Sequence, residues 1–577
     1  MVIPASRVAF GRIVKALGTL IADDVEGPRR LVRAVLFLWQ KAEYPLLVVR
    51  APRGTSDLLV EELVVQFSLW LAHQSFNEAA YWLATAYAHW VDDDVRTEQA
   101  LYFTPPKLAE RVIDDLVARG ASLTNSHWHD PACGGAAFLV PIAQRMAQAM
   151  TNTGLGKGKV LGRLQKQLSG SDLDKTLLEI SEQFLRMALY PYITTRKHVP
   201  SFQLRQADGL LARSRGVLSV PDVLACNPPY RKLKAAEATK YQAKFRDVIR
   251  NQPNIYGLFI RKTLDIVKSG GLIGLLTPTS FLSGASFSKL RTCLLARSDI
   301  LHVDMLSDRT SMFISVEQET AISVLKTRTP GMGPSAATDI CILGPQGDYL
   351  PVGTCRFSGD GTPWPVPRSV SDSDLLTASP LWTGRLKDYG YTPKVGALVP
   401  FRDIRTRFAR RPPGQAQNCI VPLIWATDIT VQGLDHGRVT RQRRTDYFVE
   451  VATAGHSSVH AGPSVVLQRL TSNDQEHRLV AAAVPVAWQK EHGGFVAENH
   501  VIVLQTFDGN PWPPELMARI LNSSVINRLY RSISGAANVA VSELIELPLP
   551  STSKLQEALK KNEDMNQAIR QAFGLNA

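Results

Sequence analysis

Apolar residues recur at helical spacing through the first ninety-odd residues, most clearly in "ELVVQFSLWLAHQSFNEAAYWLATAYAHW" from Glu62 to Trp90. This spacing predicts a helical region over 1–95. The opening stretch mixes Arg7, Arg12 and Lys15 into its apolar positions, as an amphipathic helix does and a signal peptide does not. No uninterrupted apolar run is long enough to cross a bilayer, so we expect no membrane span.

Over 96–345 short apolar runs alternate with longer segments of helical period. The strand-like runs end in "WHDPACGG", "LSGSDLD", "FQLRQADGLL" and "PDVLACNPPY", and helix-like segments such as "AAFLVPIAQRMAQAM" and "KTLLEISEQFLRMALY" lie between them. This alternation predicts an α/β domain with a mostly parallel sheet. The stretch "GLGKGKV" at Gly154 does not fit a phosphate-binding loop, and we interpret it as a solvated loop.

Downstream the pattern changes. Turn signals such as "SGDGTPWPVP" predict a linker over 346–385. A mixed α+β region of short strands and basic loops follows over 386–550, and a C-terminal amphipathic helix is expected within 551–577. The 577 residues carry a net charge of +13, a balance that is common in proteins that bind polyanions. The six cysteines form no disulfide framework, which favours a reducing cytoplasm.

Chemistry-bearing residues follow the predicted strand ends. In open α/β sheets, ligands bind at the carboxyl ends of the strands. There the chain places a glycine turn (Asp130, Pro131, Ala132, Cys133, Gly134) and then Asp172, Asp208 and Asn227. Each aspartate alone fits a helix cap or a turn equally well. Taken in series at successive strand ends, they favour a nucleoside ligand.

The run Asn227, Pro228, Pro229, Tyr230 ends the fourth predicted strand. Two prolines fix φ and remove two backbone donors, so the chain has to leave the sheet there. In the order "FTPP", "DPACGG", "SDLD", "QADGLL", "NPPY", this chain resembles the gamma-class adenine-N6 DNA methyltransferases of restriction–modification systems. The resemblance continues through "GGLIGLLTPTSFL" and "VEQETAISVL" and, more loosely, to the C-terminal "NSSVINRLYRSISGAANVAVSELIELPLP". The glycine turn reads Cys-Gly-Gly-Ala-Ala where many members have Cys-Gly-Ser-Gly.

The resemblance implies a class I S-adenosylmethionine-dependent methyltransferase fold over 96–345 and a target-recognition domain over 386–550. It implies that Thr104 holds the methionine carboxylate, the turn at Asp130–Gly134 the cofactor backbone, Asp172 the ribose and Asp208 the adenine. It also implies that Asn227 borders the cofactor as well, and that Asn227, Pro228, Pro229 and Tyr230 form the catalytic motif. In that motif Asn227 and the Pro228 carbonyl accept from the target amine, and Tyr230 packs with Phe313 on the flipped base.

The amine of adenine is a poor nucleophile because its lone pair is delocalised into the ring. Two acceptors in line with its hydrogens favour the pyramidal, nucleophilic nitrogen, and the rigid proline peptide preorganises one of them. "NPPY" also occurs in RNA and protein-glutamine methyltransferases, so those activities remain alternatives. A modification-like subunit that mainly binds DNA within a larger defence complex is a third.

Basic residues cluster beyond the α/β domain, with Phe401, Phe408, Tyr447 and Phe448 interleaved. The arginines are Arg402, Arg405, Arg407, Arg410 and Arg411 in one group and Arg438, Arg441, Arg443 and Arg444 in the other. A solvated basic face is the simpler interpretation, but downstream of a DNA-modifying domain phosphate and base-edge contacts are favoured.

His127, His129 and Cys133 lack the second ligand pair of a zinc site, so we expect no metal. Residues 1–95 lack the carboxylate pattern of a nuclease, and acids such as Glu61 and Glu62 read as a solvated helix face. We therefore expect a monomer whose partner is duplex DNA, with any restriction endonuclease a separate protein that methylation does not require.

Overall fold

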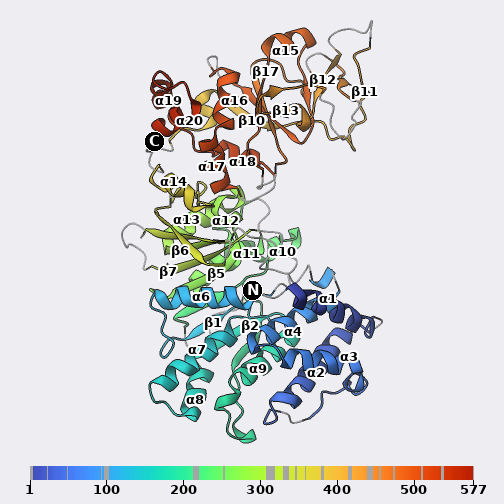
Figure 1. The fold of residues 1–577 in the computed structure, drawn as a ribbon, viewed down its shortest axis with the longest axis vertical. Coiled ribbons are helices and arrows are strands. Elements are labelled where there is room, and N and C mark those ends of the chain that lie inside the picture. The colour runs from blue at the N-terminus through green and yellow to red at the C-terminus, as the bar shows by residue number, and fades with distance from the viewer. Residues whose placement is uncertain are drawn as a thin grey trace. The chain divides into compact units, whose positions relative to one another are not determined.

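The computed structural model describes residues 4–575, apart from 23, 48–49, 93, 97–102, 212–219, 251–253, 307–318, 329–336, 345–346, 358, 379–382, 413–418, 438–445, 454–455, 472–474, 508–510 and 535–537. The chain divides into two compact units, Met1–Pro278 with Thr292–Thr338 and Thr279–Arg291 with Asp339–Ala577 (Figure 1). Phe313 and the arginines at 438, 441, 443 and 444 lie outside the described residues.

The first unit begins with helices, as the apolar spacing predicts. These are α1 (Pro4–Thr19), α2 (Gly27–Glu43), α3 (Glu62–Ala72) and α4 (Phe76–Trp90), drawn in blue in Figure 1. Aromatic side chains fill their core: the ring centroids of Phe10 and Trp82 are 4.4 Å apart, and Phe67 stacks on Trp70. Because α2 and α4 also contact α9 (Lys175–Ala188), this helical region packs against the α/β part of the same unit.

The sheet of the first unit has the order β3-β2-β1-β4-β5-β7-β6. Its strands are β1 (Trp128–Asp130), β2 (Leu168–Asp172), β3 (Gln203–Gln206), β4 (Val223–Cys226), β5 (Leu272–Pro278), β6 (Ser298–Leu306) and β7 (Thr320–Thr327). Strand β7 runs antiparallel to both of its neighbours, and the pairs from β3 to β5 are parallel. The predicted mostly parallel sheet is confirmed.

The order of the strands reverses between β1 and β4, because β2 and β3 extend the sheet to one side and β4 resumes on the other. Ligands bind at such switch points in open α/β sheets. The helices of this part are α6 (Pro106–Ala118), α7 (Leu139–Asn152), α8 (Lys157–Gln167), α9, α10 (Ala235–Phe245), α11 (Ile255–Ile266) and, from Thr292 on, α13 (Ser288–Arg297). Helix α6 contacts β5, where a Cβ at Gly274 would lie only 2.7 Å from Val112.

Helix α8 differs from the sequence-based interpretation of "GLGKGKV" as a solvated loop. The helix begins at Lys157, so only the start of that stretch, up to Gly156, is loop. Val160, Leu161 and Leu164 bury one face of α8, which packs on α7 and β2. This burial outweighs the low helix propensity of glycine inside the helix.

The second unit combines strands β8 (Thr338–Leu343) and β9 (Tyr349–Cys355) with two four-stranded sheets, β10-β19-β16-β17 and β11-β15-β12-β18. The remaining strands are β10 (Tyr391–Val395), β11 (Arg407–Phe408), β12 (Ile420–Ile424), β13 (Ile429–Thr430), β14 (Gly433–Leu434), β15 (Phe448–Glu450), β16 (Ser464–Gln468), β17 (Ala481–Val484), β18 (Val496–Ala497) and β19 (Val501–Thr506). Its helices are α12 (Ser280–Ser283), α14 (Ser373–Ala378), α15 (Val486–His492), α16 (Pro514–Asn522), α17 (Ser524–Ile533), α18 (Val541–Ile545), α19 (Thr552–Leu559) and α20 (Met565–Ala572).

Two segments of the second unit differ from expectation. The stretch 346–385, expected as a linker, carries β9 and α14 and belongs to the compact unit. The stretch 551–577 forms two helices, α19 and α20, instead of one, because Asp564 accepts from the Gln567 amide and starts a new helix. Within the described parts of the chain, no helix is both long and apolar enough to span a membrane.

Candidate active site at the strand ends

The predicted strand-end residues gather around one cavity of about 230 Å³ in the first unit, which we call the strand-end pocket. Its lining includes Thr104, Asp130, Pro131, Ala132, Cys133, Gly134, Asp172, Asp208, Asn227, Pro228, Pro229 and Tyr230. Asp130 ends β1, Asp172 ends β2, and Asn227 follows β4 directly. The parallel pairing of these strands brings residues that are far apart in the sequence to one edge of the sheet.

The glycine turn adopts a backbone that few side chains allow. Gly134 has φ +48° and Ala136 has φ +58°, both in the left-handed region. The Gly134 amide donates to Asp172 Oδ2 at 2.9 Å, which ties the turn to the end of β2. A Cβ at Gly135 would lie 2.8 Å from Ala84 Cβ in α4, so the helical region packs directly on this turn.

Burial affects the pKa of both carboxyls beside the turn. Burial raises the pKa of Asp130 to about 7, although its Oδ1 accepts from the Ala132 amide at 3.0 Å. Burial also raises the pKa of Asp172, and hydrogen bonds from the amides of Asp174 and Gly134 oppose that rise. These contacts show that both aspartates also serve the local turns, the simpler of the two roles weighed from the sequence.

Asp208 lies beyond the end of β3 and is held in a different way. Its Oδ2 accepts from Lys240 Nζ at 2.9 Å and from the Tyr241 hydroxyl at 3.0 Å, and its Oδ1 accepts from the Leu210 amide at 3.0 Å. Burial acts to raise the pKa of Asp208, but the hydrogen bonds from Lys240 and Tyr241 outweigh it and hold the pKa below its usual value. A carboxylate offers about four acceptor positions, so one is left for a ligand.

The side-chain amide of Asn227 has a hydrogen-bond partner at its nitrogen, but none at its oxygen among the described residues. Its Nδ2 donates to Thr104 Oγ1 at 3.0 Å, which orients the group. Its Oδ1 is buried and has no hydrogen-bond partner among the residues that the structure describes. A buried acceptor without a donor costs about 1–3 kcal/mol, so this oxygen is suited to a donor supplied by a ligand.

Tyr230 has a fixed hydroxyl and a partly exposed side chain that lines the pocket. The hydroxyl donates to the Leu276 carbonyl at 2.8 Å, and the ring meets Tyr256 edge-on with centroids 6.1 Å apart. Burial raises the pKa of Tyr230 well above its usual value, so the phenol stays neutral. The ring is therefore held in one place beside Asn227.

The buried cysteines and histidines near the pocket have structural roles. Burial raises the pKa of both Cys133 and Cys226 well above the usual value, which disfavours the reactive thiolate. The rings of His127 and His129 both hydrogen-bond Ser169 Oγ, at 2.9 and 2.8 Å. Burial lowers the pKa of His129 to about 4, so this side chain is a neutral hydrogen-bonding group.

Sequence reasoning missed the contributions of α4 and α10 to this region. Tyr241 of α10 lines the strand-end pocket, and Asn77 of α4 lines a smaller cavity beside Phe103 and Thr104. The helical spacing of "ELVVQFSLWLAHQSFNEAAYWLATAYAHW" predicts the helix but not what it packs on. Only the fold brings Asn77 to Thr104.

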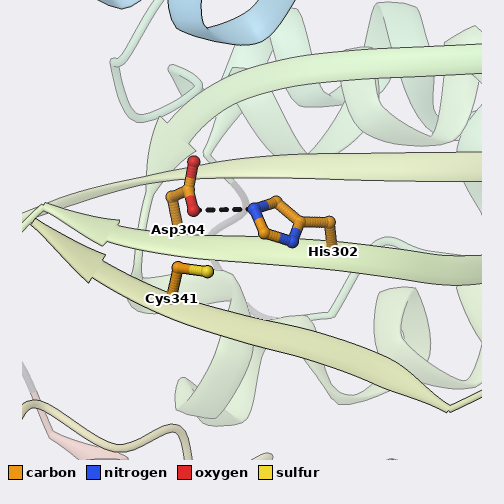
Figure 2. A group of neighbouring side chains, drawn as sticks. All are labelled: His302, Asp304 and Cys341. Carbon is orange, nitrogen blue, oxygen red and sulfur yellow. Dashed lines mark hydrogen bonds and ion pairs between the residues drawn. The ribbon is translucent and has the colours of Figure 1, made fainter. Parts of the chain in front are cut away.

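A second buried polar cluster joins α6 to β6 in the first unit. His302 Nε2 and Asp304 Oδ1 are 2.7 Å apart (Figure 2), and Arg111 donates to Asp304 Oδ2 at 2.8 Å. Burial raises the pKa of nearby Asp115 to about 7, with repulsion from Asp304 as the next cause. None of these four residues lines the strand-end pocket. Cys341, also drawn in Figure 2, belongs to the second unit.

The predicted DNA-binding arginines of the second unit are not equivalent. Arg405 donates to both carboxylate oxygens of Asp403 and to Ser458, and Arg407 donates to Asp446 at 3.2 Å. Arg411 also has a partner. Arg402 and Arg410 are exposed and make no ion pair with any part of the described chain. Beside them Phe401 and Ile404 are each 99% exposed.

Comparison with known proteins agrees with this fold. The strand order, the glycine turn and the strand-end pocket define an α/β, class I S-adenosylmethionine-dependent methyltransferase fold with an additional C-terminal domain. The solved structure of the type IIL restriction–modification enzyme MmeI in complex with DNA shares the fold, with a TM-score of 0.56 at 11% identity over 98% of this chain and 96% of that one. The expected fold class is confirmed.

The sequence itself is similar to restriction–modification methyltransferases. Residues 222–313 match the model of the Eco57I restriction-modification methylase family. The chain is 24% identical to the type II methyltransferase M.BsuBI of Bacillus subtilis over 56% of its length, and 22% identical to M.PstI of Providencia stuartii over 57%. It spans 64% and 65% of the lengths of these two relatives.

Proposed function

We propose that the chain is a site-specific DNA methyltransferase that transfers a methyl group from S-adenosylmethionine to the N6 amine of adenine in duplex DNA. The observation that carries this proposal is Asn227 Oδ1, a buried acceptor without a described partner beside Pro228 and Tyr230. The similarity to the type II methyltransferases M.BsuBI and M.PstI supports the same class of substrate.

The strand-end pocket has the donor and acceptor pattern that S-adenosylmethionine requires. Asp172 at the end of β2 is placed to accept from ribose hydroxyls, and Asp208 keeps one acceptor position for the adenine amine. The turn at Asp130–Gly134 and Thr104 line the same pocket, and they would hold the cofactor backbone and its methionine carboxylate. When bound, this cofactor supplies the methyl group on a sulfonium, so the chain's own residues have to position the amine.

Asn227 and Pro228 provide that positioning. The amide of Asn227 is oriented by its hydrogen bond to Thr104, and its Oδ1 stays without a partner among the described residues. With the Pro228 carbonyl as a second acceptor, the two hydrogens of an amine are held in line and its nitrogen becomes pyramidal. Such preorganised groups lower the barrier because they do not reorganise during the reaction.

Tyr230 offers a ring face to a base that has left the helix. Extrusion of a base costs a few kcal/mol, and one stacking contact returns roughly 1–3 kcal/mol. The hydroxyl bond to Leu276 holds the ring in place before the base arrives. Phe313, the second proposed stacking aromatic, lies outside the described residues.

The second unit is proposed to recognise the flanking sequence. Among the predicted arginines that the structure describes, Arg402 and Arg410 are exposed and are proposed to make phosphate or guanine contacts, and Phe401 and Ile404 expose apolar surface beside them. Arg405 and Arg407 are proposed to hold the shape of this loop through Asp403 and Asp446. The chain is further proposed to act as a cytoplasmic monomer, with any restriction endonuclease a separate protein that methylation does not need.

The test is methyl transfer by the purified chain to duplex DNA, RNA and a release factor, followed by nucleoside and amino-acid analysis. N6-methyladenine in duplex DNA supports the proposal, and its absence in the Asn227→Ala variant assigns the reaction to this site. Methylation of RNA or of glutamine would replace it with one of the alternatives. Tight DNA binding without methyl transfer to any substrate would favour a DNA-binding subunit of a defence complex.

A further inference from the structure

A second, smaller cavity lies next to the strand-end pocket, and helix α4 forms one side of it. Asn77, Ala80 and Ala84 of α4 line one side, and Phe103, Thr104 and Ala137 line the other. Phe103, Thr104 and Ala137 also line the strand-end pocket, so the two cavities adjoin at these three residues. The small cavity measures about 20 Å³, which is room for one group the size of a water molecule.

The polar atom that α4 brings to this place lacks a donor. Asn77 Oδ1 is buried and has no hydrogen-bond partner within the described residues. Ala80 and Ala84 of the cavity wall carry no polar side-chain atom, and neither Tyr81 nor Thr104, which also line the cavity, donates to Asn77 Oδ1. Leaving a buried acceptor unsatisfied is costly, so a ligand that occupies this space has to present a donor to it.

Helix α4 is held rigidly against the glycine turn. Ala84 approaches Gly135 so closely that a Cβ there would lie 2.8 Å from the alanine methyl. Further along α4, the Tyr87 hydroxyl donates to Asp174 Oδ2 at 3.0 Å, and Asp174 caps α9. Asn77 is therefore fixed relative to Thr104 by contacts on both sides of the turn, as a preorganised binding group has to be.

We infer that Asn77 is the acceptor for the α-ammonium group of S-adenosylmethionine, so that the N-terminal helices form one wall of the cofactor site. This inference rests on the proposed function. Thr104, proposed at the methionine carboxylate, lines the same cavity, and the ammonium sits one carbon away from that carboxylate. An ammonium is water-sized and presents only donors, which matches both the space and the open oxygen.

The first turn of α4 also carries a carboxylate, that of Glu78, although Glu78 lines neither of the two cavities. The amino end of a helix is electropositive and by itself disfavours a cation. Glu78 follows Asn77 in this turn, and its Oε2 is likewise buried without a partner among the described residues. Burial raises the pKa of Glu78 in the ligand-free chain, and a nearby cation would favour its carboxylate.

The inference is tested by calorimetric binding of S-adenosylhomocysteine and 5′-methylthioadenosine to the full chain, because only the first carries the amino-acid end. Asn77→Leu should weaken S-adenosylhomocysteine binding by about 10- to 100-fold, as removal of a hydrogen bond to a charged group does. Binding of 5′-methylthioadenosine should stay within about twofold of wild type on the same reasoning. Asn152→Leu, at the exposed end of α7, is the matched control and should change neither affinity.

An analogue of S-adenosylhomocysteine without the α-amino group separates the ammonium from the carboxylate. Asn77→Leu should leave its affinity unchanged, and weaker binding there would assign Asn77 to the carboxylate and overturn the inference. Equal losses of affinity for S-adenosylhomocysteine and 5′-methylthioadenosine would make Asn77 structural, and no loss for either would leave a water as the occupant. Both results overturn the inference.

Two further readouts keep the outcomes distinct. The free energy of unfolding of the ligand-free chain should not fall in Asn77→Leu, because the change removes an acceptor that has no donor in that state. If the wild-type chain binds neither nucleoside, the proposed function fails, and not the assignment of Asn77 alone. If it binds both without any selective effect of Asn77→Leu, only the assignment fails.

Discussion

The strand-end pocket of the first unit and the arginine segment 401–411 of the second unit differ in where their unpaired polar groups lie, since among the described residues these are buried in the pocket and exposed, at Arg402 and Arg410, in the segment. In the pocket Asn227 Oδ1 is buried without a described partner, and Asp130 is buried with no ion pair to a described cation. In the arginine segment, Arg405 and Arg407 are engaged by carboxylates of the same unit. Buried open groups are expensive, so they indicate a site whose partner is a ligand. Paired surface arginines indicate only that the segment holds its own shape.

The largest expected effect is at Asn227. Asn227→Ala removes the open acceptor and should lower kcat by about 10²–10³, by analogy with the removal of one preorganised group around a transition state. S-adenosylhomocysteine affinity should change much less than kcat, because the ribose and adenine contacts are proposed on Asp172 and Asp208, and Asn227 reaches the methionine end only through Thr104. Single-turnover methylation and calorimetric binding measure the two quantities. A wild-type rate would show that Asn227 does not act in the reaction. The unpaired Asn227 Oδ1 would then not mark the place of the target amine.

The next prediction concerns the pH dependence of stability at Asp130. The folded chain holds this carboxyl protonated up to about pH 7, whereas the usual value is 3.8. Between these values the folded state binds more protons than the unfolded state, so stability falls as the pH rises. Relative to Asp130→Asn, which cannot titrate, the wild-type free energy of unfolding should fall by up to about 1.4 kcal/mol per pH unit in this window.

Urea denaturation of the ligand-free chain from pH 5 to pH 8 gives that difference directly. Burial also raises the pKa of Asp115 to about 7, but Asp115 is present in both proteins and its contribution cancels. A difference that does not change with pH would mean that Asp130 is charged in the folded chain. The pocket would then hold a charged Asp130 carboxylate, and its difference from the arginine segment would be smaller than the structure indicates.

The sequence predicts the pocket better than the arginine segment for a physical reason. Asp130, Asp172 and Asn227 stand at strand ends, and parallel pairing alone brings strand ends together. Asn77 could not be predicted, because its place beside Thr104 comes from the packing of Ala84 on Gly135. The role of an arginine depends on which carboxylate faces it in the fold.

Some of these carboxylate partners can be inferred from the sequence and others cannot. Asp403 stands two residues before Arg405, so that pair could have been suspected from "RDIR". Asp446 meets Arg407 only because β11 pairs with β15, with Phe408 opposite Phe448. The start of helix α8 in "GLGKGKV" could not be predicted for the same reason. The helix forms because it packs on α7 and β2, and not because its residues have high helix propensity.

Tyr230 should show an effect that depends on the DNA. Tyr230→Ala should lower the methylation rate on paired adenine by the equivalent of roughly 1–3 kcal/mol, the value of one stacking contact. The loss of rate should be smaller on adenine that is mismatched or opposite an abasic site, where extrusion is less costly. Tyr230→Phe is the control, because it keeps the ring and removes only the bond to Leu276. Equal effects on all substrates would make the ring structural.

The smallest effects are expected in the arginine segment, and there they separate two kinds of arginine. The double variant Arg402→Ala/Arg410→Ala removes exposed guanidinium groups, and the slope of log affinity against log salt for duplex DNA should flatten by about 0.9 for each phosphate that the variant no longer binds. Arg405→Ala/Arg407→Ala removes the same charge from groups bound to Asp403 and Asp446, so its salt slope should stay close to that of wild type. If one of the exposed arginines reads a guanine edge, discrimination against a changed base should also fall, by about 1–3 kcal/mol. Equal flattening in both pairs would show that net charge alone attracts DNA, and the distinction between paired and open groups would then hold in the pocket but not on this surface.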